Sequence, residues 1–223
     1  SIMGWSPVVP LFIGLPLMVD MLRHLASMEM VGMVHGELDD RTIHLVDYDS
    51  RTVFTHIDAT CSLTGDGGEL SCELVDNMVG SAFLHAPEME FGVPTHISNN
   101  VWQLGLIFSK MLMGGDWLTK SAARGSAGQL DDKTQEGREE IRKFIRESFS
   151  KGSAKGFSGL HGQYADVLKM IGLMLEKDPR KRLSVHLALQ TVEGIAKRRG
   201  IKVAPRPKRR AVPLEDAEDA PSR

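Results

Sequence analysis

Residues 33–45, MVHGELDDRTIHL, place a polar segment between an apolar run and a β-prone stretch. The apolar run leads into His35, three acidic residues follow, and β-prone residues begin at Ile43. A second β-prone stretch occupies residues 53–57, and the turn-forming YDSR of residues 48–51 separates the two. The pattern predicts two short strands, paired as a hairpin, directly after an acidic loop.

Apolar residues at helical spacing lie on both sides of this hairpin and predict five helices. The fourth ends at Asp178-Pro179, because proline disfavours a helical residue before it, and Ser184 suits the N-cap of the fifth. Residues 58–85 show no sustained period and are predicted to form a long loop. The predicted fold class is mainly α, within α+β. The apolar positions are Leu15, Met18, Leu22 and Leu25; Val101, Leu104, Phe108, Met111 and Leu112; Ile141, Phe144, Ile145 and Phe149; Val167, Leu168, Ile171, Met174 and Leu175; and Leu187, Ala188, Val192 and Ile195.

Three later stretches extend the pattern: SAFLHAPEME at residues 81–90, SNNVWQLGLIFSKMLMG at 98–114 and LMLEKDPRKRLSVHLAL at 173–189. Together with residues 33–45, they resemble four protein-kinase motifs in their order and approximate spacing. These motifs are the catalytic loop H-R-D-L-x-x-x-N, the A-P-E motif, the S-D-V-W-S-L-G helix and the closing L-x-x-D-P-x-x-R segment. The resemblance covers about residues 15–195 and implies the C-terminal helical lobe of a protein-kinase-like fold.

The resemblance implies structural roles for five residues. In the family, the A-P-E glutamate pairs with the late arginine, which implies a buried ion pair between Glu88 and Arg182. His35 matches the histidine that opens the catalytic loop, and Trp102 is expected to anchor the central helix in the core. Asn100 stands where the family has an aspartate that braces the catalytic loop.

The resemblance also implies that catalytic groups have changed. Kinase catalysis depends on positioning and electrostatics around metal-bound phosphates. Glu37 occupies the position of the catalytic aspartate, and its longer side chain shifts the carboxylate by roughly one bond. A misplacement of about 1 Å can cost about 10²-fold in rate. Thr42 replaces the asparagine that holds the second magnesium, and Asp39 replaces the lysine that contacts the transferred phosphate. Asp39 and Asp40 are expected to repel a nucleotide's phosphates, and Gly36 replaces the arginine that reads activation-loop phosphorylation.

The metal-binding D-F-G motif has only a degraded counterpart. Asp58-Ala59-Thr60 is the best candidate, so Asp58 is the candidate magnesium ligand, although the phenylalanine and glycine of the motif are missing. No G-x-G-x-x-G phosphate loop and no strand lysine can be found before Leu15. We therefore expect no cofactor for this chain, and ATP with Mg²⁺ only if an intact N-terminal lobe exists.

The changes fall on the chemistry, whereas the structural motifs are kept. This contrast indicates a pseudokinase that acts as a regulatory or partner-binding scaffold. The alternative is a divergent active Ser/Thr protein kinase that uses Glu37 and whose N-lobe is missing from this chain.

The acidic catalytic loop, degraded D-F-G and long variable activation segment also resemble the rhoptry kinase and pseudokinase family of apicomplexan parasites. That narrower resemblance implies a protein partner, such as an active kinase or a host protein. It also implies secretion to a rhoptry, a vacuole or the host cell. Without it, the sequence leaves the compartment open between cytoplasm and nucleus.

The composition argues against a nucleic-acid-binding protein and against a membrane-spanning protein. Hydrophobic residues at 42%, charged residues at 25% and a net charge of −2 describe an ordinary globular chain with no field that would attract nucleic acid. No run of about 18 apolar residues occurs, so no membrane span is expected. Cys61 and Cys72 flank the Gly-rich TGDGG, and a disulfide is possible if the protein is secreted, although two reduced thiols are the default interpretation.

The predicted organisation has three parts. Residues 1–14 lead into the domain, residues 15–195 form the kinase-like lobe, and residues 196–223 form a disordered tail that is basic and then acidic. Two basic clusters, 197–199 and 208–210, resemble a bipartite nuclear-import signal. A solvated tail, balanced by the acidic residues that follow, is the preferred interpretation.

Overall fold

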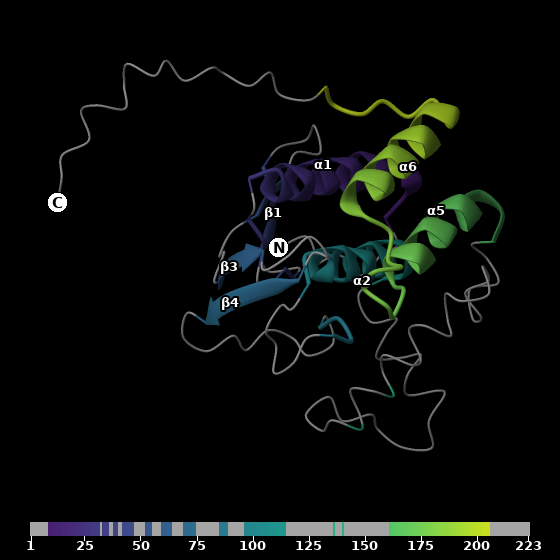
Figure 1. Cartoon of the computed structure of the whole chain (residues 1–223). Coiled ribbons are helices and arrows are strands. Elements are labelled where there is room, and N and C mark those ends of the chain that lie inside the picture. Colours follow the sequence, from purple (N-terminus) through teal and green to yellow (C-terminus); the bar gives the residue numbers. More distant parts are fainter. Residues whose placement is uncertain are drawn as a thin grey trace, which may run out of the picture.

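A computed structural model of the chain describes residues 9–31, 33–35, 38–39, 42–46, 52–54, 59–63, 69–74, 85–88, 96–114, 136, 140 and 161–205. In this part of the chain the helices pack together, with two small antiparallel hairpins beside them (Figure 1). The α+β class with mostly helical content is therefore confirmed. The elements in chain order are α1 (Leu11–Glu29), β1 (Ile43–Leu45), β2 (Thr52–Phe54), β3 (Ala59–Leu63), β4 (Leu70–Leu74), α2 (Asn99–Met113), α5 (His161–Met174) and α6 (Val185–Arg198).

Helix α1 contains the first predicted apolar stripe, and all four predicted positions are buried. It begins at Leu11, within the segment that was predicted to precede the domain. Leu11 is itself buried, and the backbone N–H of Val9 donates to the carbonyl of Met111 at 2.8 Å. Residues of the predicted entry segment therefore already pack against α2.

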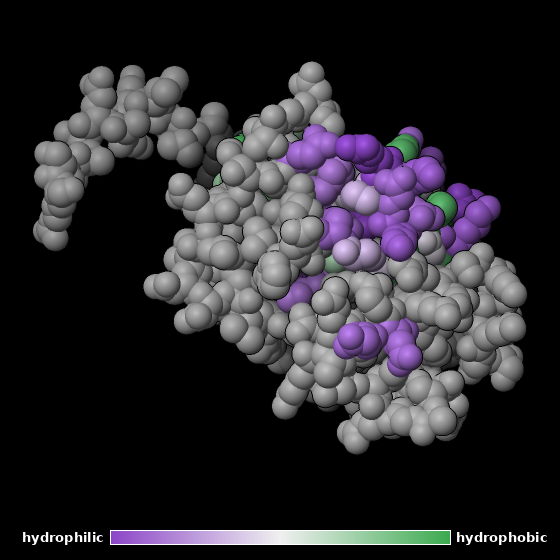
Figure 2. Space-filling view, turned by 60° about the horizontal axis from the view of Figure 1, so that its bottom comes forward, coloured by the Kyte–Doolittle hydropathy of each residue, from purple (hydrophilic) through white to green (hydrophobic). Residues whose placement is uncertain are grey.

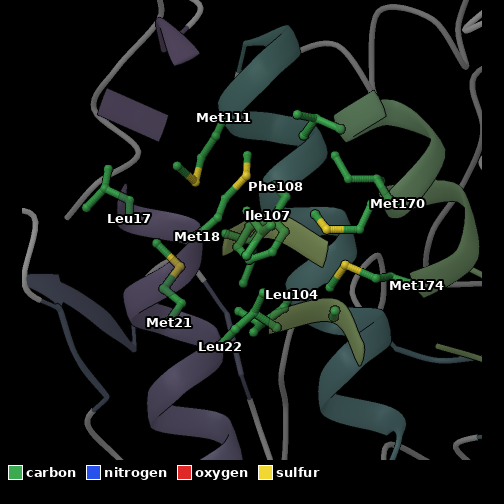
Figure 3. Packing of buried hydrophobic residues seen from close by; sticks show 14 of the residues in the cluster. Leu17, Met18, Met21, Leu22, Leu104, Ile107, Phe108, Met111, Met170 and Met174 are labelled. Carbon is green, nitrogen blue, oxygen red and sulfur yellow. The ribbon is translucent and has the colours of Figure 1, made fainter. Parts of the chain in front are cut away.

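Helix α2 is the centre of the core. All of its residues except Lys110 are buried, and Trp102 and Phe108 are among the largest fully buried side chains. Figure 3 shows side chains of α1, α2 and α5 meeting around Phe108. Gly105 permits the close approach of α5, because a Cβ there would lie 3.0 Å from Leu175 Cδ2. The predicted role of Trp102 as a core anchor is confirmed.

Two hairpins lie beside the helices. The predicted pair is β1 and β2, in which Ile43 is opposite Phe54. The second hairpin pairs β3 with β4 antiparallel and falls inside the predicted long loop, so that prediction is wrong for these residues. A signal for it exists, because apolar residues alternate at every second position through both ATCSL and LSCEL. The two strands flank the Gly-rich stretch.

The C-terminal boundary also differs from the prediction. Helix α6 continues to Arg198, Ala196 is buried, and Ile201 and Val203 pack against the core. The guanidinium of Arg23 donates to the carbonyl of Ala204 at 2.6 Å and holds this extension against α1. The tail therefore does not begin at residue 196, and residues 206–223 lie outside the described residues.

The first basic cluster of the tail is part of the folded structure. Arg199 pairs with Asp166 of α5 at 2.7 Å, and Arg198 lies 3.9 Å from the same carboxylate. The cluster at residues 208–210 lies outside the described residues, and so does the third predicted helix at residues 141–149. The nuclear-import interpretation stays a prediction.

Helix α1 is long and apolar enough to cross a membrane by length and composition alone. However, 61% of its most apolar window is buried inside the protein, as is expected of a core helix. On the face drawn in Figure 2, the coloured surface is mostly hydrophilic, with isolated hydrophobic residues. In the described ranges, then, no membrane span is positively indicated.

Candidate functional site

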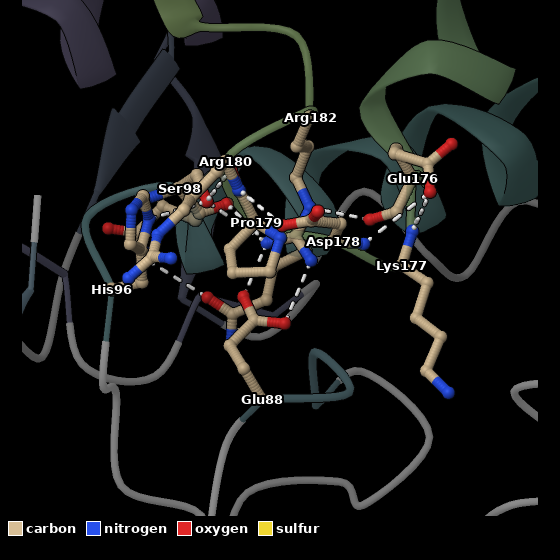
Figure 4. Close-up of polar contacts among 11 residues, drawn as sticks. Glu88, His96, Ser98, Glu176, Lys177, Asp178, Pro179, Arg180 and Arg182 are labelled. Atoms are coloured by element: carbon tan, nitrogen blue, oxygen red, sulfur yellow. Dashed lines mark hydrogen bonds and ion pairs between the residues drawn. The ribbon is translucent and has the colours of Figure 1, made fainter. Parts of the chain in front are cut away.

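The structure brings together the two charged residues whose pairing the resemblance implies. Arg182 and Glu88 are 94 residues apart in sequence and form a two-pronged ion pair (Figure 4). Nη1 donates to Oε1 at 2.5 Å and Nη2 donates to Oε2 at 2.8 Å. The Arg182 side chain is 0% exposed and that of Glu88 is 13% exposed. The predicted buried ion pair is confirmed.

Arg182 has further partners in α2, just before α2 and just after α5. Its Nη1 donates to the carbonyl of Ser98 at 3.0 Å and to the Ser98 hydroxyl at 3.2 Å. Its Nε donates to the carbonyl of Glu176 at 3.0 Å. Its Cζ lies 5.2 Å from the ring centroid of Trp102, which is a cation–π contact. We call Glu88, Ser98, Trp102, Glu176 and Arg182 the arginine cluster.

Local hydrogen bonds place Arg182 in this position. The backbone N–H groups of Lys181 and Arg182 both donate to the carbonyl of Asp178 at 3.0 Å, and the Asp178 side chain accepts from Arg180 N at 3.1 Å. Ser184 then caps α6 by accepting from Leu187 N at 3.4 Å. The Asp-Pro sequence thus ends one helix, and the serine starts the next, with the arginine between them.

Asn100 connects α2 to the segment around His35. Its Oδ1 accepts from the backbone N–H of His35 at 3.0 Å, and its Nδ2 donates to the carbonyl of the same residue and, at 2.9 Å, to Oε1 of Gln103. An amide can donate and accept at once, which an ionised carboxylate cannot do. Asparagine therefore suits this position, where it links α2 to the backbone of His35.

His35 is fully buried beside the first hairpin. Its ring makes an edge contact with Phe54 of β2, with centroids 5.8 Å apart. The ring of His24 of α1 also lies near Phe54, with centroids 5.5 Å apart. His35 therefore has a packing role, in agreement with its prediction as a structural residue.

Asp39 and Thr42 bond to each other across the loop. The Thr42 hydroxyl accepts from Asp39 N and donates to Asp39 O, and Asp39 Oδ1 accepts from Thr42 N, each at 3.0 Å. Asp39 is 1% exposed and Thr42 is 8% exposed. The prediction placed the Asp39 carboxylate where a phosphate would approach, whereas this carboxylate is buried and accepts a hydrogen bond from the backbone N–H of Thr42.

The remaining predicted site residues are not described by the structure. Gly36, Glu37, Asp40 and Asp58 all lie outside the described residues, so their roles stay predictions. In the ranges that are described, no group of three His, Cys, Asp or Glu side chains could hold a metal ion.

The sequence did not predict the contacts that connect the first hairpin to α1, or the contact that connects Ser98 of the arginine cluster to Pro179. Oδ2 of Asp20 accepts from the backbone N–H and the hydroxyl of Thr52, at 2.6 and 2.9 Å, which ties β2 to α1. Ser98 precedes α2 in the manner of an N-cap, but its hydroxyl donates to the carbonyl of Pro179 at 3.2 Å. Its position before a helix marks it in the sequence, whereas its distant partner has no local signal.

A surface pocket of about 330 Å³ borders the arginine cluster and is lined in part by Glu29, His96 and Arg180. Burial raises the pKa of the Glu29 carboxyl to about 7, because a charged carboxylate loses hydration there. In contrast to the Glu29 carboxyl, the Arg180 guanidinium is exposed, and it pairs with Glu69 at 3.0 Å. A hydrogen bond from Arg180 lowers the pKa of Glu69.

No protein-family model matches this sequence, and no curated protein matches it. The described fold and contacts define a mainly helical α+β protein organised around a buried, ion-paired arginine. The polar side chains of this cluster hold segments together.

Proposed function

We propose that this protein is a protein-kinase-like pseudokinase that acts as a regulatory, partner-binding scaffold. The observation that carries the proposal is the two-pronged ion pair between Glu88 and Arg182. It joins the A-P-E motif to the late arginine, as the resemblance implies for a kinase-like lobe. The brace from Asn100 to His35 supports the same assignment, because it links the central helix to the catalytic-loop motif.

The hydrogen bonds of Asp39 and Thr42 support a scaffold in preference to an enzyme. In the family, these two positions contact phosphate and magnesium. Here both side chains are buried and satisfy the loop's own backbone groups. A buried carboxylate and a buried hydroxyl that hydrogen-bond to each other's backbone are not presented to a nucleotide.

Nucleotide binding and phosphotransfer test the proposal. Thermal unfolding is followed with ATP and Mg²⁺, on this chain and on any longer form that the gene encodes. A ligand at about 100 times its Kd adds about 2.7 kcal/mol of stability. We expect no shift, and no transfer of labelled phosphate to a generic protein substrate or to the protein itself. Phosphotransfer that is lost in Glu37→Gln would establish the divergent-kinase alternative.

Partner capture tests the scaffold part of the proposal. Proximity labelling in cells is compared between the native protein, a Glu37→Gln/Asp58→Asn variant and an Arg182→Ala variant. We expect the first two to label the same proteins, because capture does not depend on the catalytic positions. The narrower resemblance predicts an active kinase or a host protein among them. Loss of labelling in the double variant alone would contradict a scaffold role.

A further inference from the structure

The register of the second hairpin places the only two cysteines of the chain opposite each other. Strands β3 and β4 pair antiparallel, and Cys61 and Cys72 are direct partners in the ladder. Thr60 is opposite Glu73 on one side of them, and Ser62 is opposite Ser71 on the other. The pairing is therefore fixed by several consecutive residue pairs.

Opposite positions in an antiparallel ladder suit a disulfide. Directly paired residues have Cα atoms about 5.5 Å apart at hydrogen-bonded positions and about 4.5 Å apart at the others. Disulfides span Cα distances of about 4.4–6.8 Å, so both kinds of position lie within the range. Directly paired residues also share one face of the sheet, which brings Cys61 and Cys72 to the same face.

We propose that Cys61 and Cys72 form an intramolecular disulfide that locks the β3–β4 hairpin. The oxidant is a small disulfide such as oxidised glutathione. One cysteine thiolate attacks a glutathione sulfur, forms a mixed disulfide and releases one glutathione thiol. The second cysteine thiolate attacks the protein sulfur of the mixed disulfide and releases the second glutathione. Two protein thiols are oxidised and one glutathione disulfide is reduced to two thiols.

The hairpin is connected to the arginine cluster, so the bond affects more than its own strands. Glu69, the residue before β4, forms an isolated β-bridge with His96. Its carboxylate pairs with Arg180, two residues before Arg182. His96 Nδ1 in turn lies 2.8 Å from the hydroxyl of Ser98, a member of the cluster. A covalent lock between β3 and β4 therefore steadies one attachment of the cluster.

This inference does not depend on the kinase-like proposal, because it rests on strand register alone. Metal binding by the same pair is disfavoured, since two thiolates supply half of the ligands of a structural zinc site.

A redox titration with a matched control variant tests the proposal. The native chain and Cys72→Ser/Ser71→Cys are equilibrated in glutathione buffers of graded composition, and the intramolecular disulfide is quantified by mass spectrometry after thiol blocking. The variant keeps two cysteines and nearly the same loop length, but it moves one cysteine to the other face of the strand. We expect its equilibrium constant for oxidation to be at least about tenfold lower, because bridging would require the ladder to shift.

Equal constants for the two proteins would overturn the proposal, and so would a native chain that forms only mixed disulfides or dimers. Hydrogen exchange of the native chain gives a second reading that needs no variant. Oxidation should slow exchange of the amides at 59–63 and 70–74, and unchanged exchange there would also overturn it.

Discussion

The arginine cluster and the pair Asp39–Thr42 are both polar and mostly buried, yet their hydrogen bonds are made in different ways. In the cluster, one guanidinium collects partners from residues far apart in the sequence, from Glu88 to Glu176. In the loop, Asp39 and Thr42, three residues apart, hydrogen-bond to each other. The cluster joins segments of the fold, whereas these loop contacts stabilise a single turn.

This difference separates two consequences of substitution. A group that joins distant segments cannot be replaced without loosening the fold. A group that hydrogen-bonds to a residue close to it in the sequence stabilises mainly its own loop. The contrast fits a protein that keeps a kinase-like framework without kinase chemistry, as proposed above.

The largest effect is expected at Arg182. Arg182→Ala leaves Glu88 as a partly buried carboxylate without its partner, and breaking such a pair costs about 3–5 kcal/mol. Urea unfolding at pH 7 measures the free energy of unfolding. The matched control is Arg180→Ala, whose pair with Glu69 has side chains 74% and 44% exposed and should therefore contribute much less to the free energy of unfolding. Equal losses in the two variants would remove the distinction between the cluster and the surface.

A smaller loss is expected where α2 meets the loop. Asn100→Asp restores the residue that the resemblance implies, but it removes the donor to the His35 carbonyl and to Gln103. It also buries a charge, so we expect a loss of about 2–3 kcal/mol at pH 7. The loss should shrink in acid, because a protonated carboxyl can donate one hydrogen bond. An unchanged or increased stability in urea would show that the brace does not need a donor.

Within the loop itself the expected effect is smaller again. Thr42→Val keeps the shape of the side chain and removes the acceptor for Asp39 N, with an expected loss of about 1–2 kcal/mol. Thr42→Ser keeps the hydroxyl and serves as the control. If both variants unfold at the same urea concentration as the native chain, the hydroxyl does not stabilise the turn.

The smallest effect concerns pH. The pKa of Glu29 is raised to about 7 in the folded protein, so the folded state holds this proton more tightly than the unfolded chain does. The resulting stabilisation is fully present below about pH 4.5 and is lost as the pH rises through 7. After allowance for solvent screening of this partly exposed group, we expect a loss on the order of 1 kcal/mol between pH 5 and 8. Glu29→Gln should lack this component, and parallel curves for the two proteins would contradict the shift.

Much of the framework could be predicted from the sequence. Apolar spacing located α1, α2, α5 and α6, because one buried stripe repeats at helical period in each. Motif order indicated that Glu88 and Arg182 meet, although no local pattern connects two residues so far apart. Leu187 was assigned to the buried stripe of α6, yet it is 52% exposed, since periodicity locates a stripe better than its edges.

The remaining contacts had no sufficient local signal. The apolar–polar alternation in β3 and β4 is short and built partly from small residues, and a Gly-rich stretch lies between them. The strand signal is therefore weak. The packing of residues 199–205 depends on Arg23 of α1, which a local reading of a basic segment cannot reveal. The turn bonds of Asp39 and Thr42 were hidden because the resemblance assigned both positions to ligand contacts.

A double-mutant cycle on Glu88 and Arg182 tests the central claim most directly. The free energy of unfolding is measured for the native chain, Glu88→Gln, Arg182→Met and the double variant, with a parallel cycle on Glu69 and Arg180. We predict a coupling energy of about 2–3 kcal/mol for the first pair and a clearly smaller one for the exposed pair. A first-pair coupling no larger than that of the surface pair would contradict the claim that this arginine holds distant segments of the helical fold together.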